Sequence, residues 1–165
     1  MSDVRTVVCP GSYDPVTNGH LDIIRRAANI FDRVVVGVAN NPVRKSGTRF
    51  SGEERRGFIE EATSDLANVE VQVFAELLVE FARRNEATAV LKGLRAISDF
   101  EYEFEMAQLN RLLAPEIESI YIIASPNYSF LSSTGVKEMA TFGGDVSELV
   151  PAGVAAALAE RLANQ

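Results

Sequence analysis

Short apolar runs alternate with amphipathic segments along the chain. The apolar runs are rich in Val and Ile and predict buried strands at residues 6–9, 33–39, 69–74, 89–92 and 119–124. The segments between them predict helices at residues 19–31, 52–64, 77–85, 100–113 and 133–142, and a last helix follows Pro151. This alternation predicts an α/β fold in which helices cover both faces of a doubly wound, five-stranded parallel sheet.

Acidic and aromatic residues alternate at residues 99–105. Phe100, Phe104 and Ala107 fall on one stripe at helical spacing, which predicts that this stripe joins the core. The carboxylates between them then form a solvated face. One of those carboxylates could still accept a hydrogen bond from a ribose hydroxyl.

Composition limits the possible classes of protein. The chain has 165 residues, of which 47% are hydrophobic and 24% charged, and we expect one domain with a substantial core. A net charge of -7 argues against a nucleic-acid partner, because binding to a phosphate backbone needs clustered Lys and Arg. Any anion site must therefore be a local basic pocket.

The single cysteine and single histidine exclude an internal disulfide framework and a Cys/His zinc cluster. No apolar stretch reaches the roughly 18 residues that a bilayer span needs, and no signal peptide starts at Met1. We therefore expect no membrane partner and a cytoplasmic location.

The tetrapeptide Thr17-Asn18-Gly19-His20 places the sole histidine at the predicted start of a helix. Free backbone N–H groups and the helix dipole favour an anion at such a position and disfavour a protonated imidazole. A neutral His20 can still donate one ring N–H to a phosphate, and Gly19 lets a ligand approach the backbone. The alternative is a polar residue at the start of an ordinary surface helix, since a four-residue match often arises by chance.

Polar residues follow four of the predicted strands. They lie at residues 11–20, 40–45, 92–95 and 125–134. Ligands of doubly wound sheets bind beyond the carboxyl ends of the strands, so these segments should meet at one rim. The common glycine-rich nucleotide-binding motifs are absent from the sequence, so a nucleotide here would have to bind through a different motif.

Cations in two of these segments are candidates for binding phosphate. The guanidinium of Arg95 can bind phosphate oxygens through two hydrogen bonds, and Lys92 offers a point charge. Both could instead be solvated cations at the end of a strand. Arg44 and Lys45 have the same alternative, an ordinary charged loop.

Hydroxyl groups gather before the helix predicted at residues 133–142. Ser129, Ser132, Ser133 and Thr134 are more than helix capping requires, although one of them should be the N-cap. Together with the helix N-terminus they suit the leaving phosphates of a nucleotide, and Lys137, one turn into the helix, could add charge.

The chain lacks a convincing covalent nucleophile. It has no G-x-S-x-G elbow, and Cys9 sits within a strand pattern without a cationic neighbour. Cations, hydroxyls and one imidazole suit transfer chemistry at phosphorus.

Four blocks of the sequence resemble a known family. The block PGSYDPVTNGH at residues 10–20 is similar to the opening of the nucleotidyltransferase superfamily. The blocks KGLR, DFEYE and YSFLSS, which begin at Lys92, Asp99 and Tyr128, resemble the bacterial phosphopantetheine adenylyltransferases. The resemblance implies a Rossmann-like nucleotidyltransferase fold. It also implies transfer of the adenylyl group of ATP to 4'-phosphopantetheine in coenzyme A biosynthesis, with Mg²⁺ as cofactor, a homohexamer and possible feedback inhibition by coenzyme A.

The resemblance also implies roles for individual residues. The implied catalytic residues are His20, Lys92 and Arg95. The implied ATP-binding residues are Ser12, Tyr13, His20, Gly93, Leu94, Arg95, Glu103, Tyr128, Ser129, Phe130, Leu131, Ser132, Ser133 and Thr134. The implied acceptor-binding residues are Ser12, Arg44, Leu78 and Lys92.

This chain departs from the family pattern at several positions. Tyr13 replaces a usual Phe, Thr134 a usual Ser and Arg44 a usual Lys, so either Arg44 or Lys45 could contact the acceptor. Gly135 in the first turn of a helix costs about 0.5–1 kcal/mol relative to Ala, and the sequence gives no reason for it.

Two other functions are left open by the sequence. One is a nucleotidyltransferase that acts on a different phosphate, such as nicotinate mononucleotide or glycerol phosphate. The other is a nucleotide-sensing module that binds without turnover. The loops after the second and fourth strands would discriminate between acceptors.

Overall fold

A computed structural model describes residues 4–41 and 47–164. Its sheet has five parallel strands in the order β3-β2-β1-β4-β5. The strands are β1 (Thr6–Gly11), β2 (Arg33–Ala39), β3 (Val69–Phe74), β4 (Ala89–Leu94) and β5 (Glu118–Ile123). The α-helices are α1 (Asn18–Ile30), α2 (Gly52–Ala62), α3 (Leu78–Arg84), α4 (Ile97–Leu113), α5 (Ser133–Thr141) and α6 (Ala152–Ala163). The predicted doubly wound α/β fold is confirmed.

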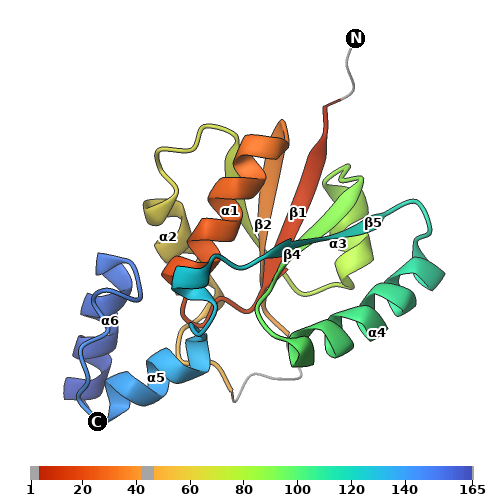
Figure 1. Cartoon of the computed structure of the whole chain (residues 1–165). Coiled ribbons are helices and arrows are strands. Elements are labelled where there is room, and N and C mark those ends of the chain that lie inside the picture. Colours follow the sequence, from red (N-terminus) through yellow and green to blue (C-terminus); the bar gives the residue numbers. More distant parts are fainter. Residues whose placement is uncertain (1–3, 42–46, 165) are drawn as a thin grey trace.

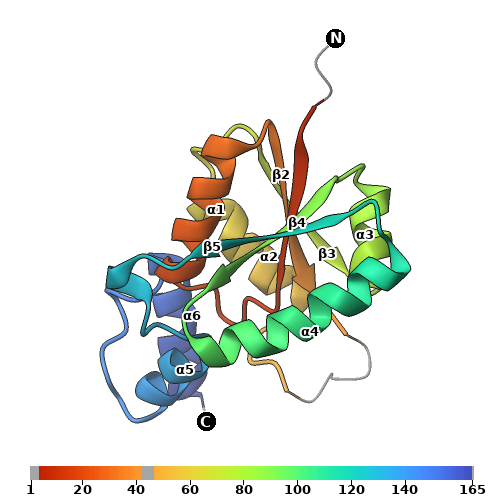
Figure 2. The same cartoon turned by 45° about the vertical axis from the view of Figure 1, so that its right-hand side comes forward.

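The helices lie on opposite sides of the sheet, with α1 and α2 on one side and α3 and α4 on the other (Figures 1 and 2). Successive β1 residues point to different cores. Val7 and Cys9 join a cluster with side chains of α1, α2, α5 and α6, whereas Val8 joins a second cluster with side chains of α3. The predicted core position of Cys9 is confirmed, and burial raises the pKa of its thiol to about 12.

Some element boundaries differ from the prediction. β1 and β4 each extend two residues further, so Gly93 and Leu94 also lie within β4. The apolar pattern stops at Leu91, but parallel pairing with β5 continues to Leu94. α4 begins three residues early, and a 3₁₀ turn (Pro126–Tyr128) that the sequence did not indicate precedes α5.

The prediction that the aromatic stripe of α4 joins the core is wrong. None of residues 97–113, all of which the structure describes, is buried, and Phe100 and Phe104 are 53% and 55% exposed. Helical periodicity identifies an apolar stripe but not what covers it. Figures 1 and 2 show α4 running along the outside of the fold, with α3 as its neighbouring helix.

Within residues 4–41 and 47–164, no helix combines the length and the apolar character needed to cross a membrane.

Candidate functional site

A cavity of about 880 Å³ opens at the carboxyl ends of β1, β2, β4 and β5. The segments that follow four of the strands share this cavity, as expected for a doubly wound sheet. The residues of the predicted site that line it are Ser12, Tyr13, His20, Lys92, Gly93, Arg95, Glu103, Tyr128, Leu131, Ser132, Ser133 and Thr134.

Other residues of the predicted site lie elsewhere. Four of them do not line the cavity: Leu78, Leu94, Ser129 and Phe130. Leu78 packs against the second core, and Phe130 is exposed. Arg44 and Lys45 lie outside the described residues.

His20 is held by its own helix cap. Thr17 is the N-cap of α1, and its Oγ1 accepts a hydrogen bond from the His20 backbone N–H at 3.3 Å. In return, the Thr17 backbone N–H donates to His20 Nδ1 at 3.0 Å. Because Nδ1 accepts this bond, the neutral ring carries its proton on Nε2. The Thr17 hydroxyl therefore caps the helix, and Nε2–H is the ring donor left for a ligand.

The environment of His20 keeps the imidazole neutral. Burial lowers its pKa to about 4, and the positive charge of Arg95 contributes in the same direction. At neutral pH the ring is therefore a hydrogen-bond donor without charge.

Tyr13 supports the imidazole from one side. Its ring meets the His20 ring edge-to-face, with centroids 5.1 Å apart, and its hydroxyl donates to the Cys9 carbonyl at 2.9 Å. That bond ties the Tyr13 ring to β1. A Cβ at Gly11 would come within 3.1 Å of the Tyr13 ring, so the glycine makes room for it.

Two carboxylates of α4 pair with two cations, one within β4 and one just after it. Lys92 Nζ lies 3.0 Å from Glu103 Oε2, and both side chains are largely buried. Arg95 Nε lies 3.3 Å from Asp99 Oδ2, while its Nη1 donates to the Leu131 carbonyl at 2.6 Å. These contacts fix the direction of each cation at the cavity.

The N-terminus of α5 lies at the same cavity. Ser132 is its N-cap and accepts the Gly135 N–H at 3.0 Å, while Ser133 Oγ donates to the Pro15 carbonyl at 2.8 Å. A Cβ at Gly135 would lie 3.1 Å from Ser132 Oγ, a tight contact with the cap. Ser129 Oγ donates to the Pro126 carbonyl at 3.1 Å, so three of the four predicted hydroxyls have structural partners.

Sequence reasoning gave no role to two charged residues of the cavity, Asp14 and Arg55. Arg55 lies on the inward stripe of α2 with Gly52 and Ile59, and a cation on a buried stripe is a signal that the sequence offered. Asp14 stood in the block at residues 10–20 without an assigned role. Its ion pair with Lys137 joins residues 123 positions apart and had no local signal.

Within the described part of the chain, no group of three or more His, Cys, Asp or Glu side chains could hold a metal ion.

Comparison with known proteins identifies relatives over nearly the whole chain. The profile of the cytidylyltransferase-like family matches residues 8–139. A phosphopantetheine adenylyltransferase from Rubrobacter xylanophilus is 57% identical over 92% of this chain and 91% of its own length. Those from Caldanaerobacter subterraneus and Streptomyces coelicolor are each 51% identical, and the matches cover 96% and 98% of this chain and 98% and 100% of theirs.

A solved structure shows the same fold. A bifunctional NMN adenylyltransferase/ADP ribose pyrophosphatase from Francisella tularensis matches with a TM-score of 0.73 at 18% identity. The match covers 98% of this chain but about half of the other, 51%. At this identity the likeness extends to the fold alone.

Proposed function

This chain belongs to the phosphopantetheine adenylyltransferases of the cytidylyltransferase-like family, and from that premise we propose that it transfers the adenylyl group of ATP to 4'-phosphopantetheine. The products are 3'-dephospho-coenzyme A and pyrophosphate, a step of coenzyme A biosynthesis. The observation that carries the proposal is the shared cavity in which a neutral His20 faces the same space as Lys92, Arg95 and the α5 N-terminus.

The reaction depends more on stabilising negative charge than on proton transfer. A phosphate monoester has a second pKa of about 6, so the acceptor is mostly dianionic at neutral pH and needs no general base. One of its oxygens attacks the α-phosphorus of ATP, and the bond from that phosphorus to the oxygen bridging to the β-phosphate breaks. The protein must align two polyanions in line and stabilise the charge that grows on pyrophosphate.

We assign that stabilisation to His20, Arg95 and the start of α5. The Nε2–H of His20 donates to a phosphate oxygen, and its depressed pKa keeps it a neutral donor throughout. Arg95 is held by Asp99 and the Leu131 carbonyl, so its guanidinium needs little reorganisation to meet the triphosphate. Lys92, which is paired with Glu103, is assigned to the acceptor.

Magnesium fits this site as a partner of the nucleotide. Mg²⁺ commonly binds through substrate phosphates, water and one or two carboxylates. The cavity carboxylates Asp14, Asp99 and Glu103 are already paired with Lys137, Arg95 and Lys92 respectively, which favours phosphates as the main ligands. Bound magnesium would supply positive charge to the triphosphate.

A homohexamer has support from the exposed apolar surface. We define the α4 face as the exposed apolar side chains of that helix: Ile97, Phe100, Tyr102, Phe104, Leu109, Leu112 and Leu113. Large exposed apolar side chains gathered on one helix are typical of a surface that contacts another protein. We propose that copies of the chain meet there. Feedback by coenzyme A and a cytoplasmic location stay predictions.

Pyrophosphate release tests the proposed function. Purified protein with ATP and Mg²⁺ would be given 4'-phosphopantetheine, nicotinate mononucleotide or glycerol phosphate. We expect rapid release with the first acceptor alone. Release with another acceptor would reassign the substrate, and ATP binding without release would indicate a nucleotide-sensing module.

A further inference from the structure

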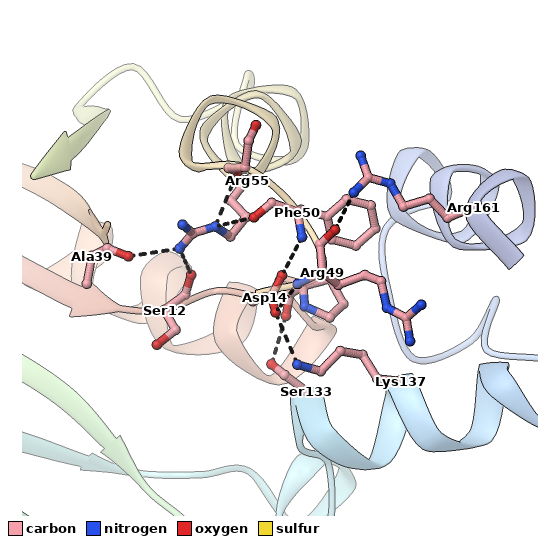
Figure 3. A network of polar contacts seen from close by, with 11 residues as sticks. Ser12, Asp14, Ala39, Arg49, Phe50, Arg55, Ser133, Lys137 and Arg161 are labelled. Carbon is pink, nitrogen blue, oxygen red and sulfur yellow. Dashed lines mark hydrogen bonds and ion pairs between the residues drawn. The ribbon is translucent and has the colours of Figure 1, made fainter. Parts of the chain in front are cut away.

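Arg55 of α2 is a fully buried cation beneath the cavity, with 0% of the residue exposed. Figure 3 shows its guanidinium pointing away from α2 toward the strand ends. Four of its five N–H groups are used: one on Nε, two on Nη1 and one on Nη2. Its acceptors are the carbonyls of Ser12 at 2.6 Å, Ala39 at 2.9 Å, and Phe50 and Ser51 at 3.2 Å each, and Asn40 Oδ1 at 3.3 Å.

These acceptors come from three segments that border the cavity. Ser12 follows β1, Asn40 follows β2, and Phe50 lies just before α2. One planar side chain therefore fixes the end of β1 and both ends of the connection from β2 to α2. A lysine has three donors on one nitrogen and cannot reach acceptors spread over such a fork.

The charge of Arg55 has weak local compensation. Among the described residues, no carboxylate oxygen forms an ion pair with it within 4 Å. Burial lowers its pKa, and the more distant charge of Asp14 opposes that shift. A buried cation without a close counter-charge costs free energy, so its several hydrogen bonds must supply something that an apolar residue could not.

Asp14 holds the same connection from the other side. Its two carboxylate oxygens accept the backbone N–H groups of Arg49 at 2.8 Å and Phe50 at 2.9 Å, and Oδ2 also lies 3.1 Å from Lys137 Nζ. The peptide groups of Phe50 are thus held at both ends, the N–H by Asp14 and the C=O by Arg55 (Figure 3).

A third cation secures the side chain of this residue. The guanidinium of Arg161 lies 4.8 Å from the centre of the Phe50 ring and also donates to the Arg49 carbonyl. Residues 49–51 are therefore tied to α6 as well as to α2 and the loop after β1.

We propose that Arg55 and Asp14 are positioning residues that fix the β2 wall of the cavity against Ser12. We define the β2 wall by the cavity-lining residues on either side of the gap in the described chain: Asn40, Asn41, Gly47 and Thr48. The proposal rests on the proposed function, in which the opposite side of the cavity holds the triphosphate. The β2 wall then faces the acceptor, and its placement sets acceptor affinity.

Arg55→Lys tests the fork, with Arg56→Lys as the matched control. Arg56 is the next residue of α2, is partly exposed and pairs with Glu60 at 2.8 Å. In Arg55→Lys we expect the KM and Kd for 4'-phosphopantetheine to rise about tenfold, the effect of losing one or two charged hydrogen bonds. The Kd for ATP should stay within about twofold, and Arg56→Lys should match wild type.

A merely structural role of Arg55 would give another pattern. Fewer folded molecules would lower kcat and leave both substrate affinities unchanged, and circular dichroism would report the loss of folded protein. A folded Arg55→Lys with wild-type acceptor affinity would overturn the proposal.

Asp14→Asn tests whether the Asp14 carboxylate holds the backbone of Arg49 and Phe50. This test requires neither a folded Arg55 variant nor a measurement of turnover. The amide places an NH₂ group against a backbone N–H and cannot pair with Lys137 as an anion. We expect amide hydrogen exchange at Arg49 and Phe50 to become at least about tenfold faster, with β2 amides unchanged, and acceptor affinity to fall. Unchanged exchange, or faster exchange with unchanged acceptor Kd, would contradict the proposal. Wild-type protein without pyrophosphate release would instead refute the proposed function, and the exchange result would still be readable.

Discussion

Helices α1 and α4 border the same cavity but are held in different ways. α1 buries Ile23, Ile24 and Ala27 in the core, and its N-terminus is closed by the reciprocal bonds of Thr17 and His20. α4 is longer, has no side-chain cap, and none of its residues, all of them described, is buried.

Residues on α1 are positioned by a single chain, whereas we expect the positions of residues on α4 to depend on contacts between chains. The position of His20 follows from the core of its own chain. Glu103 and Asp99 pair with Lys92 and Arg95, but the helix that carries these carboxylates presents its apolar face outward. In the proposed hexamer, contact at the α4 face would stabilise the carboxylates and, through them, the two cations.

Replacing His20 by alanine should have the largest effect on turnover. Removing one preorganised donor from a developing charge costs roughly 10²–10³ in kcat. Because α1 is held by its own core, the assembly measured by light scattering should not change. Near-normal turnover in His20→Ala would show that the imidazole has no part in the mechanism. The contrast between α1 and α4 would then no longer hold for catalysis.

Replacing Lys92 by alanine should weaken the acceptor complex. The lost charged hydrogen bond is worth about 1.5–3 kcal/mol, which corresponds to roughly 10- to 100-fold in the Kd for 4'-phosphopantetheine by calorimetry. Arg111→Ala is the control, since Arg111 is an exposed cation of α4 that does not line the cavity. An unchanged Kd in Lys92→Ala would contradict the assignment.

Phe104→Asp should split the assembly and lower turnover about fivefold, because a charge in a buried apolar interface is costly. Ile30→Asp is the matched control: it introduces the same charge on α1 at a residue that is 51% exposed, close to the 55% of Phe104. Light scattering and turnover assays check both. If Phe104→Asp keeps the wild-type mass, copies of the chain do not meet at the α4 face.

The pKa of His20 should make stability depend on pH. Its folded pKa of about 4 lies below the unfolded value of 6.5, so the unfolded chain binds more protons between these values. Stability should therefore be full above about pH 6.5 and fall as pH decreases toward 4, by on the order of 1 kcal/mol for this partly exposed ring.

Chemical unfolding at pH 7 and pH 5 checks this sign. His20→Gln should show a smaller loss between the two pH values than wild type. Equal losses would mean that the ring is not held neutral by its surroundings.

The fold and the convergence of the site were predictable because both follow from local pattern. Runs rich in Val and Ile predicted the five strands of the described sheet. Parallel strands bring their carboxyl ends to one rim, so the meeting of Ser12, Arg95 and Ser132 required no knowledge of contacts. The helix start at His20 was predictable from the same short-range chemistry.

The parts that could not be predicted depend on contacts between distant residues. The α4 face has the periodicity of a buried stripe, and no sequence pattern shows whether the residues that bury it belong to the same chain. Arg55 is one of two neighbouring arginines on α2, and only the fold shows that its acceptors come from the end of β1, from β2 and from the residues before its own helix.

A structure of the protein with a non-hydrolysable ATP analogue and Mg²⁺ tests the central claim most directly. The account predicts phosphate oxygens about 2.7–3.2 Å from His20 Nε2 and from the Arg95 guanidinium, next to the N-terminus of α5. A triphosphate bound elsewhere, with His20 contacting no phosphate, would contradict it.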